Sequence, residues 1–117
     1  MSVQVLVASS VQDLGMAAAD AVLDRLAARA NPVLGIATGS SPLPLYEQLA
    51  RRSRELPRLR GFALDEYLGL PPGHPQSYRE VVRREGVEPL GLGPADVPGR
   101  NGAVADPERA AADYDEL

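Results

Sequence analysis

The stretch VLGIATGSSP, residues 33–42, decides the fold. Its aliphatic first half, Val33–Ala37, is too short for a helix and is typical of a buried β-strand. Pro42 then suits the first turn of a helix, because its missing N–H would have no partner there. A strand that passes through a tight turn into a helix, here expected from Leu45 to about Arg54, is the repeating unit of parallel α/β sheets.

Similar signals flank this unit on both sides. Towards the N-terminus, the sequence predicts a mostly buried strand over Val3–Ala8, followed by a helix that Ser10 caps and that ends near Asn31. Towards the C-terminus, it predicts a strand over 59–64, a loop over 65–76, a helix over 77–85, a loop-like stretch over 86–102 and a helix over 106–117. Because strands and helices alternate, we expect a Rossmann-like α/β fold, with a mostly parallel sheet and helices on both faces.

The expected sheet is small, and the last expected helix has no stop signal. Three parallel strands leave two unpaired edges, which compact proteins avoid. The last five residues include three acids, the wrong charge for the C-terminal end of a helix. We therefore expect an apparently incomplete fold, in which residues 1–117 form the N-terminal part of a single larger domain. A frayed natural terminus is the alternative.

Composition excludes several kinds of chemistry. A length of 117 residues suits one small domain, and a net charge of −4 argues against nucleic acid as a partner. The chain has no cysteine and one histidine, and all twelve of its basic residues are arginine, so we expect no metal site and no Schiff-base lysine. No stretch approaches the roughly 20 apolar residues of a membrane span, and no signal peptide is recognisable. We expect a cytoplasmic protein with no membrane partner.

The turn after the second expected strand is a candidate phosphate site. Thr38, Gly39, Ser40 and Ser41 offer hydroxyl groups and closely approachable backbone N–H groups at the start of a helix. The positive end of a helix dipole favours an anion at such a turn. The stretch matches neither a Walker A loop nor a dinucleotide-binding fingerprint, so it gives little support to nucleotide binding. A capped strand-to-helix turn without a ligand is the alternative interpretation.

Two acids follow the third expected strand. A carboxylate at the end of a buried strand can be partly desolvated, which makes it a usable base for a carbon-bound proton. Successive residues of an extended chain point to opposite sides, so we expect only one of Asp65 and Glu66 to face the cleft. Since parallel strands end at the same edge of a sheet, Asp65 is expected to face the turn at 38–41. A solvated turn or a helix cap is the alternative.

Together these pieces strongly resemble the glucosamine-6-phosphate deaminases. The motifs that carry the resemblance are GIATGSSPLPLY at 35–46, LDEYLGLP at 64–71 and HPQSY at 74–78. The similarity covers nearly the whole chain but corresponds to about the first half of that family's usual length. It implies that residues 1–117 are the N-terminal part of a sugar-phosphate isomerase/deaminase domain.

The resemblance also implies a reaction and a role for each candidate residue. The family converts glucosamine 6-phosphate and water into fructose 6-phosphate and ammonia, without an organic cofactor. Asp65 would remove the proton from C2 of the opened sugar, and the turn at 38–41 would help to seat the 6-phosphate. The expected partner is therefore a small-molecule sugar phosphate, while homo-oligomer formation stays open.

The chain departs from the family pattern in one important respect. The family opens the sugar ring with a histidine in a Gly-x-x-Gly-His-Ile-type segment, which is absent here, and His74 aligns with a different loop. We therefore expect little or no turnover by this polypeptide alone. Two other functions stay open, namely a sugar-phosphate hydrolase like 6-phosphogluconolactonase and a non-catalytic sugar-phosphate sensor.

Overall fold

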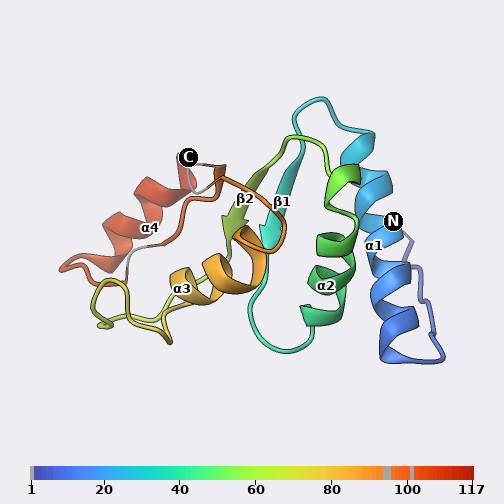
Figure 1. Ribbon diagram of the computed structural model, residues 1–117. Coiled ribbons are helices and arrows are strands. Elements are labelled where there is room, and N and C mark those ends of the chain that lie inside the picture. Colours follow the sequence, from blue (N-terminus) through green and yellow to red (C-terminus); the bar gives the residue numbers. More distant parts are fainter. Residues whose placement is uncertain (1, 94–95, 101) are drawn as a thin grey trace.

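The computed structural model describes residues 2–93, 96–100 and 102–117. These residues form four α-helices and two β-strands (Figure 1), together with a short 3-10 helix and one turn of π-helix. In chain order they are α1 (Val11–Ala27), β1 (Val33–Ile36), α2 (Leu43–Arg51), η1 (Ser53–Glu55), β2 (Arg60–Ala63), α3 (Tyr78–Val82), η2 (Arg83–Val87) and α4 (Pro107–Asp115).

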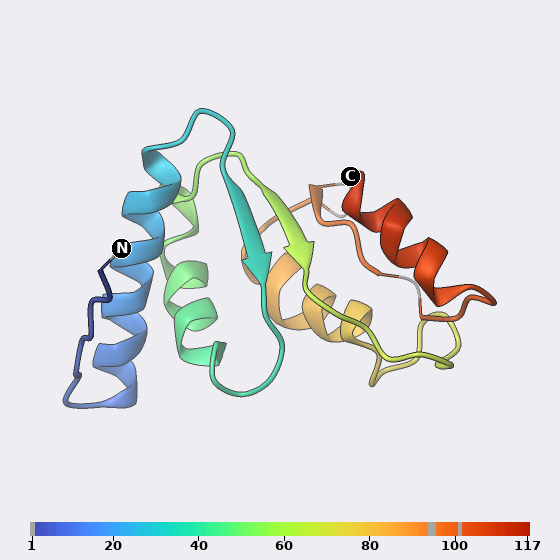
Figure 2. The ribbon, with the colours of Figure 1, turned by 180° about the vertical axis from the view of Figure 1, so that it is seen from behind.

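The two strands pair in parallel, and their register brings the carboxyl ends together. Val33 lies opposite Arg60, and Ile36 lies opposite Ala63. Both strands therefore end at one edge of the sheet, and the loops that follow them start there (Figure 2). This parallel pairing confirms the expected α/β fold class.

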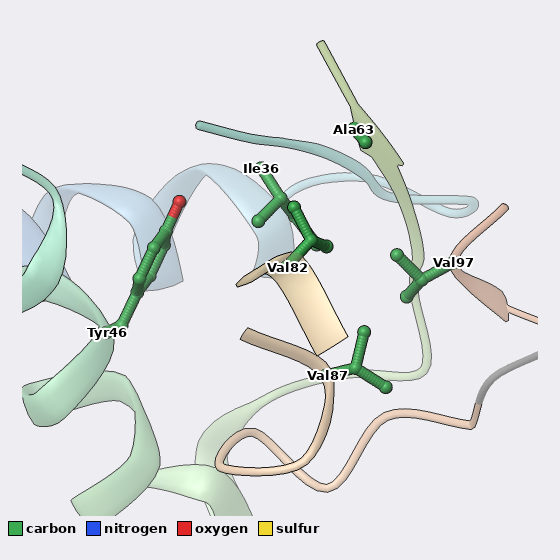
Figure 3. Packing of buried hydrophobic residues seen from close by; sticks show 6 residues of the cluster. All are labelled: Ile36, Tyr46, Ala63, Val82, Val87 and Val97. Atoms are coloured by element: carbon green, nitrogen blue, oxygen red, sulfur yellow. The ribbon is translucent and has the colours of Figure 1, made fainter. Parts of the chain in front are cut away.

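One face of the sheet carries the hydrophobic core. Because side chains alternate along a strand, Leu34, Ile36, Gly61 and Ala63 share this face. Ile36 is only 1% exposed and lies at the centre of the cluster in Figure 3. The cluster also contains buried side chains from α2, α3, η2 and the segment before α4, namely Tyr46, Val82, Val87 and Val97.

Helix α1 is held against the sheet indirectly, through α2. Ala19 and Leu23 of α1 pack with Leu49 of α2 in a second buried cluster. The two helices approach closely at Gly15, since a Cβ atom there would lie 2.5 Å from the carbonyl oxygen of Pro44. Ser10 caps α1 as expected, accepting a hydrogen bond from the backbone N–H of Asp13 at 3.0 Å.

The opposite face of the sheet meets α4. Phe62 makes an edge-to-face contact with Tyr114 of this helix, with ring centroids 5.9 Å apart. The guanidinium group of Arg60 lies 5.0 Å from the centre of the Phe62 ring. Helices therefore contact both faces, although Val33 on the α4 side keeps 58% of its surface exposed.

The predicted strand over Val3–Ala8 is wrong for the structure. The segment is extended but unpaired, and it runs beside α1 (Figures 1 and 2) with most of its side chains exposed. A strand needs a neighbour for its backbone N–H and C=O groups, and none of the described residues provides one for this segment.

Three of the expected helices are present with shifted ends, while the fourth continues into an unexpected turn. Helix α1 ends at Ala27, four positions before Asn31, and α2 ends at Arg51. Ser77 and Asp106 cap α3 and α4 through hydrogen bonds from the N–H groups three residues later. The predicted loop at 86–102 begins inside η2, and Val87 in this turn is buried in the core.

Candidate functional site

The turn at 38–41 leaves the carboxyl end of β1 and leads into α2. Gly39 adopts a left-handed conformation with φ of 97°, which glycine adopts without steric cost. No side chain caps the start of α2. Pro42 and Pro44 carry no N–H group, and the N–H of Leu43 donates to the carbonyl oxygen of Ser40 at 3.3 Å. Ser40 lines an open cleft of about 470 Å³ that lies between α1 and α2.

The hydroxyl group of Tyr46 fixes the chain just before this turn. It donates a hydrogen bond of 2.6 Å to the carbonyl oxygen of Ala37, one residue after β1. Burial of the ring in the core raises the pKa of Tyr46, and the bond to Ala37 partly offsets that rise. Tyr46 therefore anchors the entrance to the turn from the covered side of the sheet.

Asp65 follows the end of β2 by two residues, at the same edge of the sheet as the turn at 38–41. Its side chain is exposed, so the expected partial burial is wrong for the described residues. A cavity of about 230 Å³ beside Asp65 is lined by Arg100, by Gly102 and by residues of α4. Residues of the 38–41 turn do not line this cavity.

Glu66 points elsewhere and ties the loop after β2 to α3. Its carboxylate accepts three backbone hydrogen bonds of 2.8 Å, from the N–H groups of Tyr67, Tyr78 and Arg79. Two of these donors belong to the first turn of α3, where an acidic group also complements the helix dipole. The two acids thus have different surroundings. Among the described residues, backbone N–H groups hold the carboxylate of Glu66 and not that of Asp65.

The loop after β2 is also held against the segment before α4. Gly69 donates a backbone hydrogen bond of 2.9 Å to the carbonyl oxygen of Gly102. A Cβ atom on Gly102 would lie 1.8 Å from the carbonyl oxygen of Tyr67, so only glycine fits at this position. The rings of Tyr67 and Tyr78 contact each other at a tilt of 49°, and their hydroxyl groups share a hydrogen bond that raises the pKa of Tyr67.

Arg100 is a further polar group at this end of the sheet. Its guanidinium lies 4.5 Å from the centre of the Tyr114 ring and 4.0 Å from a carboxylate oxygen of Asp115. It lines the cavity beside Asp65 and also an adjoining cavity of about 270 Å³ beside Glu66. Arg100 thus places a positive charge next to the candidate base.

Sequence reasoning missed the clamp at Glu66, the close approach at Gly102 and the position of Arg100. The sequence did contain a signal for the clamp at Glu66. Ser77 and Glu80 have the spacing of a capping box, which marks the start of the helix whose N–H groups bind Glu66. The other two depend on how residues 98–102 return to the sheet, which no local pattern reveals. His74 serves its own loop, as its Nδ1 accepts a hydrogen bond from the N–H of Gln76.

The described residues contain no cluster of three or more histidine, cysteine, aspartate or glutamate side chains that could hold a metal ion. In the same ranges, every helix is too short or too polar to cross a lipid bilayer.

Comparison with known proteins identifies relatives along almost the whole chain. A glucosamine-6-phosphate deaminase of Arthrobacter sp. (strain FB24) is 44% identical over 117 residues, which is 97% of this chain and 45% of that protein. A glucosamine-6-phosphate deaminase of Streptomyces coelicolor is 40% identical, over 96% of this chain and 44% of that protein. No protein-family model matches the sequence.

A solved structure has the same fold. It is a monomeric glucosamine-6-phosphate deaminase described as a missing link of the NagB superfamily, and it superposes with a TM-score of 0.87 at 28% identity. The match covers 98% of this chain and 49% of that one. The chain spans about half the length of the curated relatives it matches. Sequence and fold therefore agree that this chain belongs to the glucosamine-6-phosphate deaminase family, as its motifs predicted.

Proposed function

We propose that residues 1–117 are the N-terminal part of a single glucosamine-6-phosphate deaminase domain, and that they supply its catalytic base and part of its phosphate site. The observation that carries this proposal is the parallel register of β1 and β2. With Ile36 opposite Ala63, the hydroxyl-rich turn and Asp65 both leave one edge of the sheet. The family membership supplies the substrate, glucosamine 6-phosphate, and the products, fructose 6-phosphate and ammonia.

In this proposal the turn at 38–41 holds the 6-phosphate. The backbone N–H groups of the turn and the hydroxyls of Thr38, Ser40 and Ser41 donate to phosphate oxygens. The left-handed conformation of Gly39 keeps side-chain atoms away from the approaching anion. Anchoring one end of a flexible open-chain sugar holds C2 near the base, which removes much of the entropic cost of the reaction.

Asp65 is then the general base. Its carboxylate takes the proton from C2, and the electron pair of that C–H bond forms a C1–C2 double bond. The aldehyde oxygen takes up a proton from solvent, so the aldehyde becomes an enol. Return of a proton to C1 leaves an imine at C2, which water hydrolyses to the ketone and ammonia. Glu66 acts as a positioning residue for Asp65, because its three backbone hydrogen bonds fix the next residue of the loop.

A chimera tests this proposal. Residues 1–117 replace the matching part of the Arthrobacter sp. (strain FB24) deaminase, and ammonia release from glucosamine 6-phosphate is measured. We expect turnover by the chimera and little or none by residues 1–117 alone, because the ring-opening histidine segment is absent. Release of ammonia by the 117-residue chain at rates near those of the chimera would contradict the second expectation.

Variants of the chimera separate the two roles. Asp65→Asn should lower kcat by about 10²–10⁴-fold while the sugar phosphate still binds, since only the proton acceptor is lost. Ser41→Ala should mainly raise KM, by roughly 10-fold, as expected for a lost hydrogen bond to a charged group. Asp24→Asn, on the exposed surface of α1, is the matched control and should leave both constants unchanged.

The same chimera distinguishes the competing functions. Hydrolysis of 6-phosphogluconolactone without ammonia release from the amino sugar would favour the lactonase-like hydrolase. Binding of the sugar phosphate that survives Asp65→Asn, with no turnover in the parent chimera, would favour a sensor. A cytoplasmic location and a homo-oligomeric assembly stay predictions from the sequence and its family resemblance.

A further inference from the structure

Arg100 carries a buried hydrogen-bond donor that its surroundings do not satisfy. Its Nε atom is buried and makes no hydrogen bond with any described residue, although 29% of the side chain is exposed. The nearest acid is Asp115, whose carboxylate oxygen lies 4.0 Å from the guanidinium group, beyond hydrogen-bond distance. Burying a donor without a partner is costly, and the cost is explained where a bound ligand accepts hydrogen bonds from the group.

Contacts with α4 fix the position of this guanidinium group. It lies over the ring of Tyr114, 4.5 Å from the ring centre. The hydroxyl group of Tyr114 donates to the carbonyl oxygens of Ala63 and Pro98. Ala63 is the last residue of β2 and comes two positions before Asp65. Arg100 is therefore held relative to the strand end that carries the proposed base, and such fixed placement is what a donor to a developing charge requires.

The cavity beside Asp65 suits the reacting end of a small sugar. Its volume of about 230 Å³ is several times the roughly 30 Å³ that a water molecule occupies in the liquid. Among the described residues that line it, Arg100 is the one cationic side chain, and the acids are Asp65 and Glu66. Three backbone N–H groups already bind the carboxylate of Glu66. A ligand in this cavity therefore meets Asp65 and Arg100 together.

The proposed reaction creates negative charge close to the base. When Asp65 takes the proton from C2, the electron pair of the C–H bond forms the C1–C2 double bond, and the carbonyl electron pair of C1 moves onto the C1 oxygen. This oxygen is two bonds away from C2. A group that stabilises its charge must therefore share a cavity with the base.

We propose that Arg100 is a further catalytic residue, whose guanidinium group donates hydrogen bonds to the C1 oxygen of the substrate as that oxygen becomes negative. Arginine stays protonated in proteins, so Arg100 stabilises the charge without giving up a proton, and the proton of the enol comes from solvent. This inference rests on the proposed function. It adds to Asp65 the group that accommodates the charge which Asp65 creates.

Two substrate analogues test the charge preference without turnover. The aldonate analogue of glucosamine 6-phosphate has a carboxylate at C1, and the alditol analogue has a neutral alcohol there. Calorimetric titration gives the dissociation constant of each for the chimera and for the 117-residue chain. In both proteins, Arg100→Gln should weaken binding of the aldonate by about tenfold or more and of the alditol much less, because hydrogen bonds between two charged groups are the stronger ones.

Kinetics of the chimera test the catalytic step. Arg100→Gln should lower kcat by about 10²–10³-fold and change KM much less, as when one donor to a developing charge is removed. Arg109→Gln makes the same substitution at an exposed arginine of α4 and is the matched control, which should leave both constants unchanged. Free guanidinium ion at millimolar concentration should partly restore the turnover of Arg100→Ala, but not that of Asp65→Asn.

A purely structural role of Arg100 predicts different results. If Arg100 only held α4 in place, Asp115→Asn would lower kcat as much as Arg100→Gln, and free guanidinium ion would restore nothing. That pair of results would overturn the inference. So would an unchanged kcat in Arg100→Gln, or equal losses of affinity for the two analogues. Failure of the proposed function would instead appear as a parent chimera that releases no ammonia, and the analogue titrations would still decide whether Arg100 binds a negative C1 group.

Discussion

The two faces of the β1–β2 sheet differ in what covers them. On one face, Ile36 and Ala63 are buried under side chains of α2, α3 and η2. On the other, Phe62 meets Tyr114 of α4, while Val33 is more exposed than buried. The less covered face also carries the charged side chain of Arg60, so the covered face is the more apolar of the two.

This difference shows which contacts hold the 117-residue chain together. The covered face provides a contiguous core that joins both strands to three helical segments, and the uncovered face contributes little apolar burial. Residues on the covered face should therefore govern the free energy of unfolding of the 117-residue chain.

Truncation of one residue on each face tests that division. Ile36→Ala should lower the free energy of unfolding by about 2–5 kcal/mol, as for other large-to-small changes in a packed core. Val33→Ala, on the exposed face of the same strand, should change it by less than about 0.5 kcal/mol. Urea unfolding followed by circular dichroism measures both, and equal losses would show that the two faces are equally packed.

Alanine substitutions at two glycines compare the cost of a steric clash with the cost of an unfavourable backbone conformation. Gly102→Ala should cost about 1–3 kcal/mol, because the added Cβ atom meets the fixed carbonyl oxygen of Tyr67. Gly39→Ala should cost about 1–2 kcal/mol, since its Cβ atom meets nothing within 4 Å and only the left-handed conformation is unfavourable. In hydrogen exchange, Gly102→Ala should also expose the amide of Gly69, whereas Gly39→Ala should not.

Elements with local signals were predictable from the sequence. The strands β1 and β2 lie within the predicted ranges, and Ser10 caps α1 as expected, while Ser77 and Asp106 cap α3 and α4. Each depends on a short pattern, either an aliphatic run or a hydroxyl or carboxylate three residues before an N–H group. Such patterns are sufficient because the interactions they describe join residues close in sequence.

The predicted strand at Val3–Ala8 shows where local patterns are not sufficient. Its residues have the composition of a buried strand, but burial needs a neighbouring strand and a covering layer, which the described residues do not provide. The sequence identified the edge of the sheet at which candidate groups gather, and it could not supply the surfaces that would bury them.

One tyrosine hydroxyl binds the end of each strand, from opposite faces of the sheet, so removing each hydroxyl compares the two faces. Tyr46 donates to the carbonyl oxygen after β1, and Tyr114 donates to Ala63 at 2.8 Å and to Pro98 at 3.0 Å. Tyr46→Phe and Tyr114→Phe should each cost about 1 kcal/mol. Because the side chains come from opposite faces, the double variant should lose the sum to within about 0.5 kcal/mol. A larger discrepancy in the urea midpoints would indicate that the two faces are coupled.

The smallest expected effect is an alkaline loss of stability. The chain has no lysine and no cysteine, so its four tyrosines are the side chains that titrate near pH 10. Burial raises the pKa of Tyr46 and of Tyr114 above the usual value of 10.0, which means that the folded chain keeps these protons when the unfolded chain has begun to lose them. The unfolded state then binds fewer protons, and the free energy of unfolding falls as the pH rises above 10.

Urea midpoints at pH 8 and pH 10.5 should show this fall in the parent chain and a weaker fall in Tyr46→Phe. An unchanged fall in both phenylalanine variants would assign the alkaline loss to the exposed pair Tyr67 and Tyr78, where the shared hydrogen bond raises the pKa of Tyr67.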